Sequence, residues 1–576
     1  MNLFTVLRTI GTVFALLSLV TVFFYFGSQS DHQLQFYFQM FIKISTAFGI
    51  VSTITRYIED WKKDFSVIFS DVIFTSYFLF LIFNSLRLIP FFETSFAFVL
   101  AAIILFVREF STIEINYKRK ILNPAQLFII SFMAIILLGA FALMLPKATE
   151  NGIDFLDALF TSTSAVCVTG LSVVDTQTSF TIFGKTIIMV LIQIGGLGIL
   201  TFASYFAYFF KGGTSVENTL VLGELANENK VGEVFKTVGR ILILTLSIVL
   251  FGAIGIFFTV PKELFNGFWE QVFFSLFHSV SAFNNAGFST LSNGLYDTSL
   301  RFNYSLHLIV AGLIIFGGIG FPIMFNVLRF IKYKVILLVN QFYNTKKRTH
   351  IPWVVNLNTQ IILITTTILL IMGTLGFYFF EYNGVLKDHG PFGKWVTAFF
   401  GAVTPRTAGF NTVDMASLSF STLMFTILLM WIGASPASTG GGIKTSTFAI
   451  ATLNFISLAK GKDRIEINRR EVADISIRRA FAIISLSLAV IGFAVLILVK
   501  IEPDKDFIHL SFECFSAFST VGLTINVTPH LGEGGKLVII GLMFIGRVST
   551  LTFLIAIIRK TKYKNYKYPK EEILIN

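Results

Sequence analysis

Residues 160–170 read FTSTSAVCVTG, and the chain contains three further versions of this stretch. They are FHSVSAFNNAG at 277–287, FFGAVTPRTAG at 399–409 and FECFSAFSTVG at 512–522. Each version begins with phenylalanine and ends with glycine after nine intervening residues, and three of them contain a Ser-Ala pair at the same offset. The final glycines are separated by 117, 122 and 113 residues. This near-constant spacing predicts four internal repeats.

The sequence around these stretches is that of a membrane protein. Of the 576 residues 54% are apolar and 14% are charged, which leaves too few charges for the polar surface of a soluble protein of this size. Apolar runs of about 20 residues can cross the ~30 Å hydrocarbon core as helices. The predicted spans are 5–27, 37–55, 66–86, 94–110, 126–146, 183–210, 237–260, 304–330, 354–380, 420–459 (interrupted), 478–500 and 536–558.

Basic residues gather in alternate gaps between these spans, where Lys and Arg mark the cytoplasmic side. Their distribution predicts a multi-pass protein of the plasma (inner) membrane, in contact with lipid, with both termini in the cytoplasm. The same distribution accounts for the net charge of +12 without a nucleic-acid partner. The two cysteines form no disulfide framework. No Gly-x-Gly-x-x-Gly unit follows a strand, so we expect no nucleotide site and no cofactor in this chain.

The four repeated stretches lie in shorter apolar segments on the outer side, at about 155–170, 269–287, 393–409 and 506–522. These segments are too short to cross the bilayer, so we expect re-entrant half-helices followed by loops that line a cavity. The predicted fold class is an all-α polytopic membrane protein with four pseudo-symmetric helix–pore loop–helix repeats around a central pore. The boundaries are 1–115 for about four extra N-terminal helices, then 116–235, 236–350, 351–465 (with the interrupted second helix) and 466–576 (with a cytoplasmic tail).

Four such loops can form a selectivity filter for a cation. An ion that enters a narrow pore loses its water shell, and a ring of backbone carbonyls can replace it without added charge. Each half-helix directs its negative C-terminal end toward the pore, and the final glycine permits positive φ. We predict that the cation is bound only through backbone carbonyls, with no other metal and no catalytic residue. The predicted filter residues are Val168, Thr169, Gly170, Asn285, Ala286, Gly287, Thr407, Ala408, Gly409, Thr520, Val521 and Gly522.

Below the loops, the stretch GASPASTGGGIK at 433–444 interrupts the tenth span. Its proline and its three consecutive glycines, Gly440, Gly441 and Gly442, cannot hold a continuous helix. We expect this stretch to be a gate anchored at one end by Lys444, and the alternative is a plain kink. Arg547 is predicted to point into the pore below the filter as an electrostatic barrier, and the alternative is an ion pair with an acidic residue between helices.

The small pairs at this depth are Gly195-Gly196, Gly317-Gly318 and Gly433-Ala434, with Gly546 before Arg547. For Gly195 and Gly317, helix packing and a functional role both remain open. In the loops themselves, we expect Arg406 to point toward the outer surface or an acidic neighbour. His278 is expected to be a packing residue. Glu513 either accepts buried hydrogen bonds or raises the cation density at the entrance.

The chain resembles the Trk/Ktr/HKT superfamily of potassium transporters, and most of all the bacterial Trk and Ktr membrane subunits. The resemblance covers about residues 120–560. It rests on CVTGLS, NNAGFST, TPRTAGFNT and STVGLT in the loops, and on IGGLGIL, GGIGFP and GASPASTGGGIKTSTF in the helices that follow them.

This resemblance implies potassium uptake by a homodimer that binds a cytosolic nucleotide-binding regulatory subunit with RCK domains. Serine at the first loop position accompanies sodium transport in plant relatives, so Gly170 favours potassium. A sodium-selective or poorly selective transporter of the same architecture is the alternative. Channel and coupled symport both remain open. A membrane enzyme would require clusters of His, Asp, Glu or Ser that the spans lack, and a structural scaffold would not require four re-entrant loops.

Overall fold

The protein is helical throughout the part of the chain that the computed structural model describes, which is residues 3–28, 32–59, 65–83, 94–110, 124–198, 234–342, 355–550 and 553–554. Within these ranges the strands are β1 (Glu466–Ile467) and β2 (Arg470–Glu471), which form one antiparallel hairpin after the third repeat. The all-α prediction is confirmed. Apolar side chains such as those of Phe251, Phe258 and Phe493 remain exposed on the outer helices, as lipid-facing positions require.

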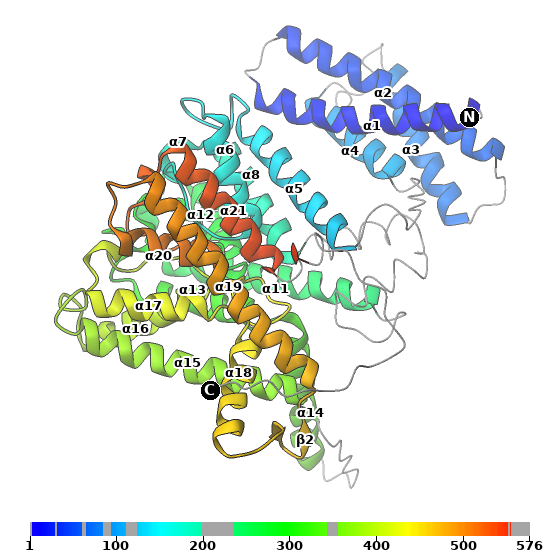
Figure 1. Cartoon of the computed structure of the whole chain (residues 1–576). Coiled ribbons are helices and arrows are strands. Elements are labelled where there is room, and N and C mark those ends of the chain that lie inside the picture. Colours follow the sequence, from blue (N-terminus) through cyan, green and yellow to red (C-terminus); the bar gives the residue numbers. More distant parts are fainter. Residues whose placement is uncertain are drawn as a thin grey trace.

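The first four helices form a bundle of their own, drawn in dark to light blue in Figure 1. They are α1 (Leu3–Gly27), α2 (His32–Glu59), α3 (Phe65–Phe83) and α4 (Ser95–Phe110). Lys43 lies within α2 without breaking it, with its Nζ 5.9 Å from the centre of the Phe98 ring. Two buried ion pairs join the helices, Arg56–Glu109 and Arg108–Asp71. Charges inside a membrane bundle are expected to pair in this way.

The remaining helices repeat one order four times, namely a long helix, a half-helix, a loop and a second helix. Repeat 1 contains α5 (Pro124–Leu143), α6 (Phe155–Cys167), the short α7 (Thr176–Ser179) and α8 (Ile182–Leu197). Repeat 2 contains α11 (Val234–Thr259), α12 (Phe268–Phe283), α13 (Tyr304–Ile319) and α14 (Phe321–Phe342). Repeat 3 contains α15 (Leu357–Glu381), α16 (Pro391–Val403), α17 (Phe420–Trp431) and α18 (Thr445–Ala459). Repeat 4 contains α19 (Asp474–Ile501), α20 (Phe507–Phe518) and α21 (Glu533–Val548).

The half-helices α6, α12, α16 and α20 have 13, 16, 13 and 12 residues, respectively, which is too short to cross a bilayer. Short 3-10 helices follow three of the four loops, at Gly294–Tyr296, Met415–Ser417 and Thr528–His530. Another, Lys262–Leu264, precedes α12. The predicted interruption of the tenth span is confirmed, because α17 ends at Trp431 and α18 begins at Thr445.

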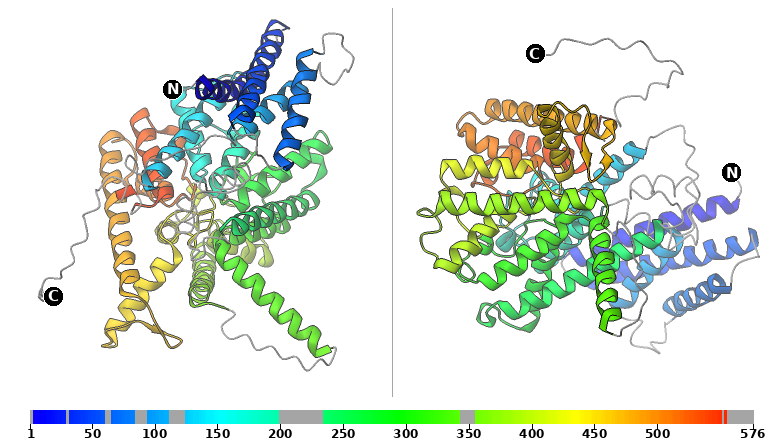
Figure 2. Two further views of the ribbon diagram at one scale, coloured as in Figure 1. Left: turned by 90° about the vertical axis from the view of Figure 1, so that its right-hand side faces the viewer. Right: turned by 90° about the horizontal axis from the view of Figure 1, so that it is seen from below.

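The predicted span 304–330 is not one continuous helix. The chain forms α13 and α14, which meet at an angle of 104°. The break lies at Gly320, whose φ of 93° is left-handed and not helical. Figure 2 shows α14 leaving the helices around α13 in a different direction. The apolar sequence continues across the break, so hydropathy alone does not reveal it.

Comparable breaks end the second helix in two other repeats. α8 stops before Gly198, with φ 77°, and α21 stops before Ser549, with φ 75°. The predicted spans 183–210 and 536–558 are therefore too long as continuous helices. Residues 199–233, which include the end of the first of these spans, lie outside the described residues. The second helices of repeats 1, 2 and 4 consequently end shortly after Gly196, Gly318 and Gly546, whereas α17 of repeat 3 ends at Trp431, just before Gly433.

Candidate ion pathway

The four pore loops share one backbone conformation. In each loop the residue two positions before the final glycine is left-handed, although it is not glycine. These residues are Val168 (φ 58°), Asn285 (φ 60°), Thr407 (φ 73°) and Thr520 (φ 50°). The final glycines are also left-handed, with φ of 93°, 67°, 78° and 90° for Gly170, Gly287, Gly409 and Gly522, respectively. Positive φ at every second residue allows successive carbonyls to face the same side, whereas a regular strand alternates them.

The final glycines meet in a closed ring. A side-chain carbon placed on any of them would collide with the backbone of the next loop. The partner in each case is the carbonyl oxygen of the residue before the next glycine, in the pairs Gly170–Ala286, Gly287–Ala408, Gly409–Val521 and Gly522–Thr169. The loops therefore follow one another in chain order, and the fourth contacts the first. Only glycine permits backbones to approach so closely.

A hydroxyl group anchors each loop to its half-helix. The Ser164 and Ser516 hydroxyls accept hydrogen bonds from the amides of Gly170 and Gly522, at 3.0 and 3.1 Å, respectively. The Ser281 hydroxyl instead donates to the carbonyl of Phe288 at 2.8 Å. These three serines belong to the Ser-Ala pairs noted in the sequence.

The third loop is one residue shorter than its sequence alignment suggests. Its anchor is Thr404, whose hydroxyl donates to the carbonyl of Phe410 at 2.6 Å. Thr404 lies five positions before Gly409, whereas the three serines lie six positions before their glycines. The phenylalanine in the buried position is Phe400 and not Phe399. Because two phenylalanines are adjacent here, the sequence pattern alone selected the wrong one.

The segment that interrupts the third repeat lies directly against two of the loops. A side-chain carbon on Gly440 would collide with the Thr407 hydroxyl, and one on Gly441 with the Thr520 hydroxyl. One on Gly442, whose φ is 66°, would lie 3.2 Å from Ser519 Cβ. The three glycines are therefore needed for close packing beneath the ring.

Contacts within this segment hold its first and last residues together. Ile432 and Ile443 form an isolated parallel bridge. The Lys444 ammonium donates to the carbonyl of Gly440 at 2.6 Å. The predicted anchoring role of Lys444 therefore has a specific partner, which is the first of the three glycines.

Arg547 connects three repeats below the ring. Its guanidinium donates to the carbonyl of Thr439, in the interrupting segment, and to the carbonyl of Gly195, at the end of α8. In the described ranges no carboxylate forms an ion pair with it, so the alternative of an acidic partner is not supported. Arg547 is thus held by backbone acceptors on both sides.

The glycines at the start of the small pairs serve close packing. A side-chain carbon on Gly195, Gly317 or Gly546 would collide with the carbonyl oxygen of Val166, Phe283 or Phe518, respectively. These carbonyls lie at the C-terminal ends of α6, α12 and α20. The packing interpretation of Gly195 and Gly317 therefore holds. Gly433 differs, because it faces Gly441 of its own segment.

Three further polar residues of the loops are buried. His278 is a packing residue as expected, with ring nitrogens 2.9 Å from the Phe274 carbonyl and 3.0 Å from the Ser289 hydroxyl. Glu513 accepts hydrogen bonds from the hydroxyls of Thr524 and Thr528. The expectation for Arg406 is wrong, because its side chain is 8% exposed and has no acidic partner among the described residues.

The sequence did not predict the left-handed backbone conformation of the loop residues Val168, Asn285, Thr407 and Thr520. It also did not predict the carbonyls that accept hydrogen bonds from Arg547. Nothing in the residue types could have signalled either, since Val, Asn and Thr share no preference for positive φ and every residue has a carbonyl.

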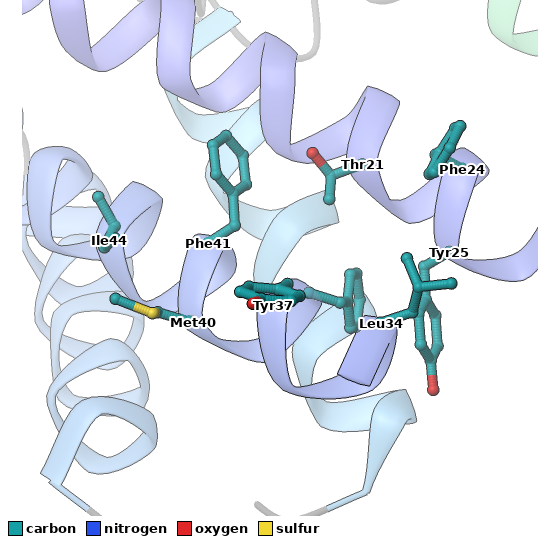
Figure 3. Close-up of a pocket in the computed structure, with 9 residues that line it drawn as sticks. Thr21, Phe24, Tyr25, Leu34, Tyr37, Met40, Phe41 and Ile44 are labelled. Atoms are coloured by element: carbon teal, nitrogen blue, oxygen red, sulfur yellow. The ribbon is translucent and has the colours of Figure 1, made fainter. Parts of the chain in front are cut away.

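A cavity of about 380 Å³ lies elsewhere, between α1 and α2 (Figure 3). It is lined mainly by apolar and aromatic side chains such as Leu34, Phe38 and Ile44, and it contains no charged group.

The half-helices, the glycine ring and the interrupted helix define a membrane transport protein built from four repeats. The TrkH family, described as "Cation transport protein", matches residues 90–567. The chain is 38% identical over 453 residues to the Ktr system potassium uptake protein B of Bacillus subtilis (strain 168), which covers 78% of this chain and 96% of that protein. It is 37% identical over 472 residues to the potassium/sodium uptake protein NtpJ of Enterococcus hirae, which covers 81% of this chain and 100% of that protein.

The crystal structure of the potassium transporter TrkH from Vibrio parahaemolyticus has the same fold, with a TM-score of 0.59, 17% identity, and coverage of 85% of this chain and 95% of that chain. The chain therefore belongs to the TrkH family of cation transport proteins. It is a multi-pass membrane transporter of the Trk/Ktr group and not an enzyme, as the sequence motifs predicted. The family match begins at residue 90, so α1, α2 and α3 lie outside it.

Proposed function

We propose that this protein takes up K+ across the plasma membrane through a filter made of its four pore loops. The observation that supports this most strongly is the closed ring in which Gly170, Gly287, Gly409 and Gly522 each contact the next loop. A ring of four backbones can surround a dehydrated cation with carbonyl oxygens. The potassium uptake proteins named among the relatives favour K+ as the ion.

The half-helices support the proposal electrostatically. α6, α12, α16 and α20 all end within a few residues of the ring glycines. The C-terminal end of a helix carries about half a negative elementary charge, so four such ends favour a cation at the ring. The loops then need no acidic side chain at the ion.

The gate in this proposal is the segment 433–444, with Gly440, Gly441, Gly442 and Lys444, held in place by Arg547. The glycines pack beneath the third and fourth loops, where the segment would obstruct the path to the cytoplasm. The bond from Arg547 to the Thr439 carbonyl would keep it there. Release of this bond would open the path.

The test of the filter is Gly170→Ser. A side chain at this position must displace the Ala286 carbonyl and is strained at φ 93°, so the preference for K+ over Na+ should fall. The measurement is relative K+ and Na+ flux in proteoliposomes. The matched control is Gly312→Ser in α13, where a side-chain carbon meets nothing within 4 Å. Unchanged selectivity in a folded Gly170→Ser protein would exclude Gly170 from the filter.

A sodium-selective or poorly selective transporter is the second candidate. The name of NtpJ, a potassium/sodium uptake protein of nearly equal identity to this chain, favours it. The flux measurement on the parent protein separates the two candidates, because the first predicts a clear preference for K+ and the second predicts none or the reverse.

We further propose that the chain forms a homodimer and binds a cytosolic nucleotide-binding subunit with RCK domains on its cytoplasmic face. The family resemblance implies this assembly, and several relatives are named as proteins of a Ktr system. Both termini would then lie in the cytoplasm, as the basic gaps between spans predict.

A further inference from the structure

Arg406 occupies an unusual place in the third pore loop. It immediately precedes Thr407, the left-handed residue of that loop. Its side chain lines a small cavity of about 20 Å³ between α13 and α15, together with the apolar residues Ile314, Leu370 and Ala434. The cavity is large enough for about one water molecule. The guanidinium is thus enclosed behind the filter loop and does not reach the outer surface.

The charge of Arg406 lacks a counter-charge within the described part of the chain. Its Nε makes no hydrogen bond there, and no carboxylate lies within ion-pair distance. The only other polar side chain at the cavity is that of Thr366, whose hydroxyl also has no partner. A hydroxyl can solvate a guanidinium in part, but it cannot neutralise it.

The other charged groups near the loops are held differently. Lys444 and Arg547 donate to backbone carbonyls, and Glu513 accepts from two threonine hydroxyls. Of these four groups, Arg406 alone has a buried nitrogen without an acceptor. Because little water surrounds it, the field of its charge is weakly screened and extends to the nearby ring.

We propose that Arg406 sets the affinity of the filter for its cation by placing a fixed positive charge behind the third loop. This inference rests on the proposed function. The negative ends of four half-helices attract the cation, and the positive charge opposes them. Conduction requires that an ion bind well enough to enter and weakly enough to leave, and Arg406 shifts this balance toward release.

The test compares charge with shape at this position. Arg406→Gln and Arg406→Met remove the charge and keep much of the volume, whereas Arg406→Lys keeps the charge. For a separation of about 15 Å and an effective dielectric constant of about 20, a unit charge changes the affinity for a monovalent cation about six-fold. The neutral variants should therefore show a half-saturating K+ concentration about six-fold lower in proteoliposome uptake, and Arg406→Lys should stay near the parent.

Two further measurements make the outcome specific. Lys387→Gln removes an exposed positive charge of the third repeat, where water and salt screen it, and should leave half-saturation unchanged. Thermal unfolding of the purified proteins at increasing K+ reports affinity without transport, and the neutral variants should show a given rise in Tm at about six-fold lower K+ than the parent. A role in packing alone would not shift either affinity in this direction.

Several results would overturn the proposal. Neutral variants with the parent's half-saturation would show that the charge does not reach the ion. An Arg406→Lys protein that behaves like Arg406→Gln would assign the effect to shape. Failure of both neutral variants to assemble, with a well-assembled Arg406→Lys, would place the charge in folding. A parent protein that transports no cation would instead refute the proposed function itself.

Discussion

The bonds of Arg547 permit a quantitative prediction for Arg547→Ala. The substitution removes two charge-assisted hydrogen bonds, to the Thr439 and Gly195 carbonyls. Such bonds contribute about 1.5–3 kcal/mol each, and we take the lower value because Arg547 is only partly buried. If both bonds exist only in the closed state, that state loses about 3 kcal/mol, which is about a hundred-fold change in the open-to-closed ratio.

The assay is K+ efflux from proteoliposomes without a regulatory subunit, in which resting flux reports the open fraction. Arg547→Ala should raise this flux strongly. The increase reaches its maximum when every protein molecule is open. Arg301→Ala is the control, because it removes an arginine that pairs with Asp388 in the outer loops, far from the segment. Resting flux equal to that of the parent in a folded, assembled Arg547→Ala protein would refute the proposal that Arg547 holds segment 433–444 in the closed position.

Two other predictions concern the segment and the assembly. Deletion of Gly440, Gly441 and Gly442 shortens the obstruction beneath the ring and should raise leak flux, whereas an unaltered flux in a folded protein would make the stretch a structural kink. In detergent, light scattering should give the mass of a dimer, and a cytosolic RCK protein should co-purify with the chain. A cysteine placed in the tail at 559–570 should be labelled only from the cytoplasmic side. A monomer would contradict the proposed dimer, and labelling from outside would contradict the proposed topology.

The sequence predicted the repeats well because two independent signals coincide in them. Hydropathy gave the spans, and the recurrence of a phenylalanine–glycine unit located the short segments that became α6, α12, α16 and α20. Gly170 and its three counterparts could be recognised because only glycine satisfies a positive φ and a close backbone approach together. Proline and consecutive glycines likewise exposed the interruption after Trp431.

Other features are not visible in a hydropathy plot. The break at Gly320 lies within apolar sequence, where only Gly320 and Pro322 indicate a helix boundary, and the break at Ser549 lies between Arg547 and Thr550, which a helix can also contain. The sequence alignment of the third loop is wrong by one residue because the sequence does not show which of two adjacent phenylalanines is buried. Arg406 was expected to point toward the outer surface or an acidic neighbour because a positive charge facing the pore would repel the permeant cation, but its side chain instead lies beside a small cavity between α13 and α15.

The asymmetry of the third and fourth repeats is best understood from the geometry of the breaks. In repeats 1, 2 and 4 the second helix ends at a single left-handed residue, Gly198, Gly320 or Ser549. In repeat 3 the break widens to the 13 residues between α17 and α18. One such segment can extend under a four-membered ring only if the other three repeats leave the space free.

The residues at that depth are suited to this arrangement. A side-chain carbon on Gly196 would collide with Asn284, and one on Gly318 would lie 3.9 Å from Ala434 Cβ. The single long side chain comes from repeat 4, where Arg547 bonds to repeat 1 on one side and to the segment of repeat 3 on the other. In the proposed mechanism one loop and one arginine therefore suffice to close the pore, whereas a large residue at Gly196 would displace Asn284, and one at Gly318 would meet Asn285 before it reached Ala434 of the segment.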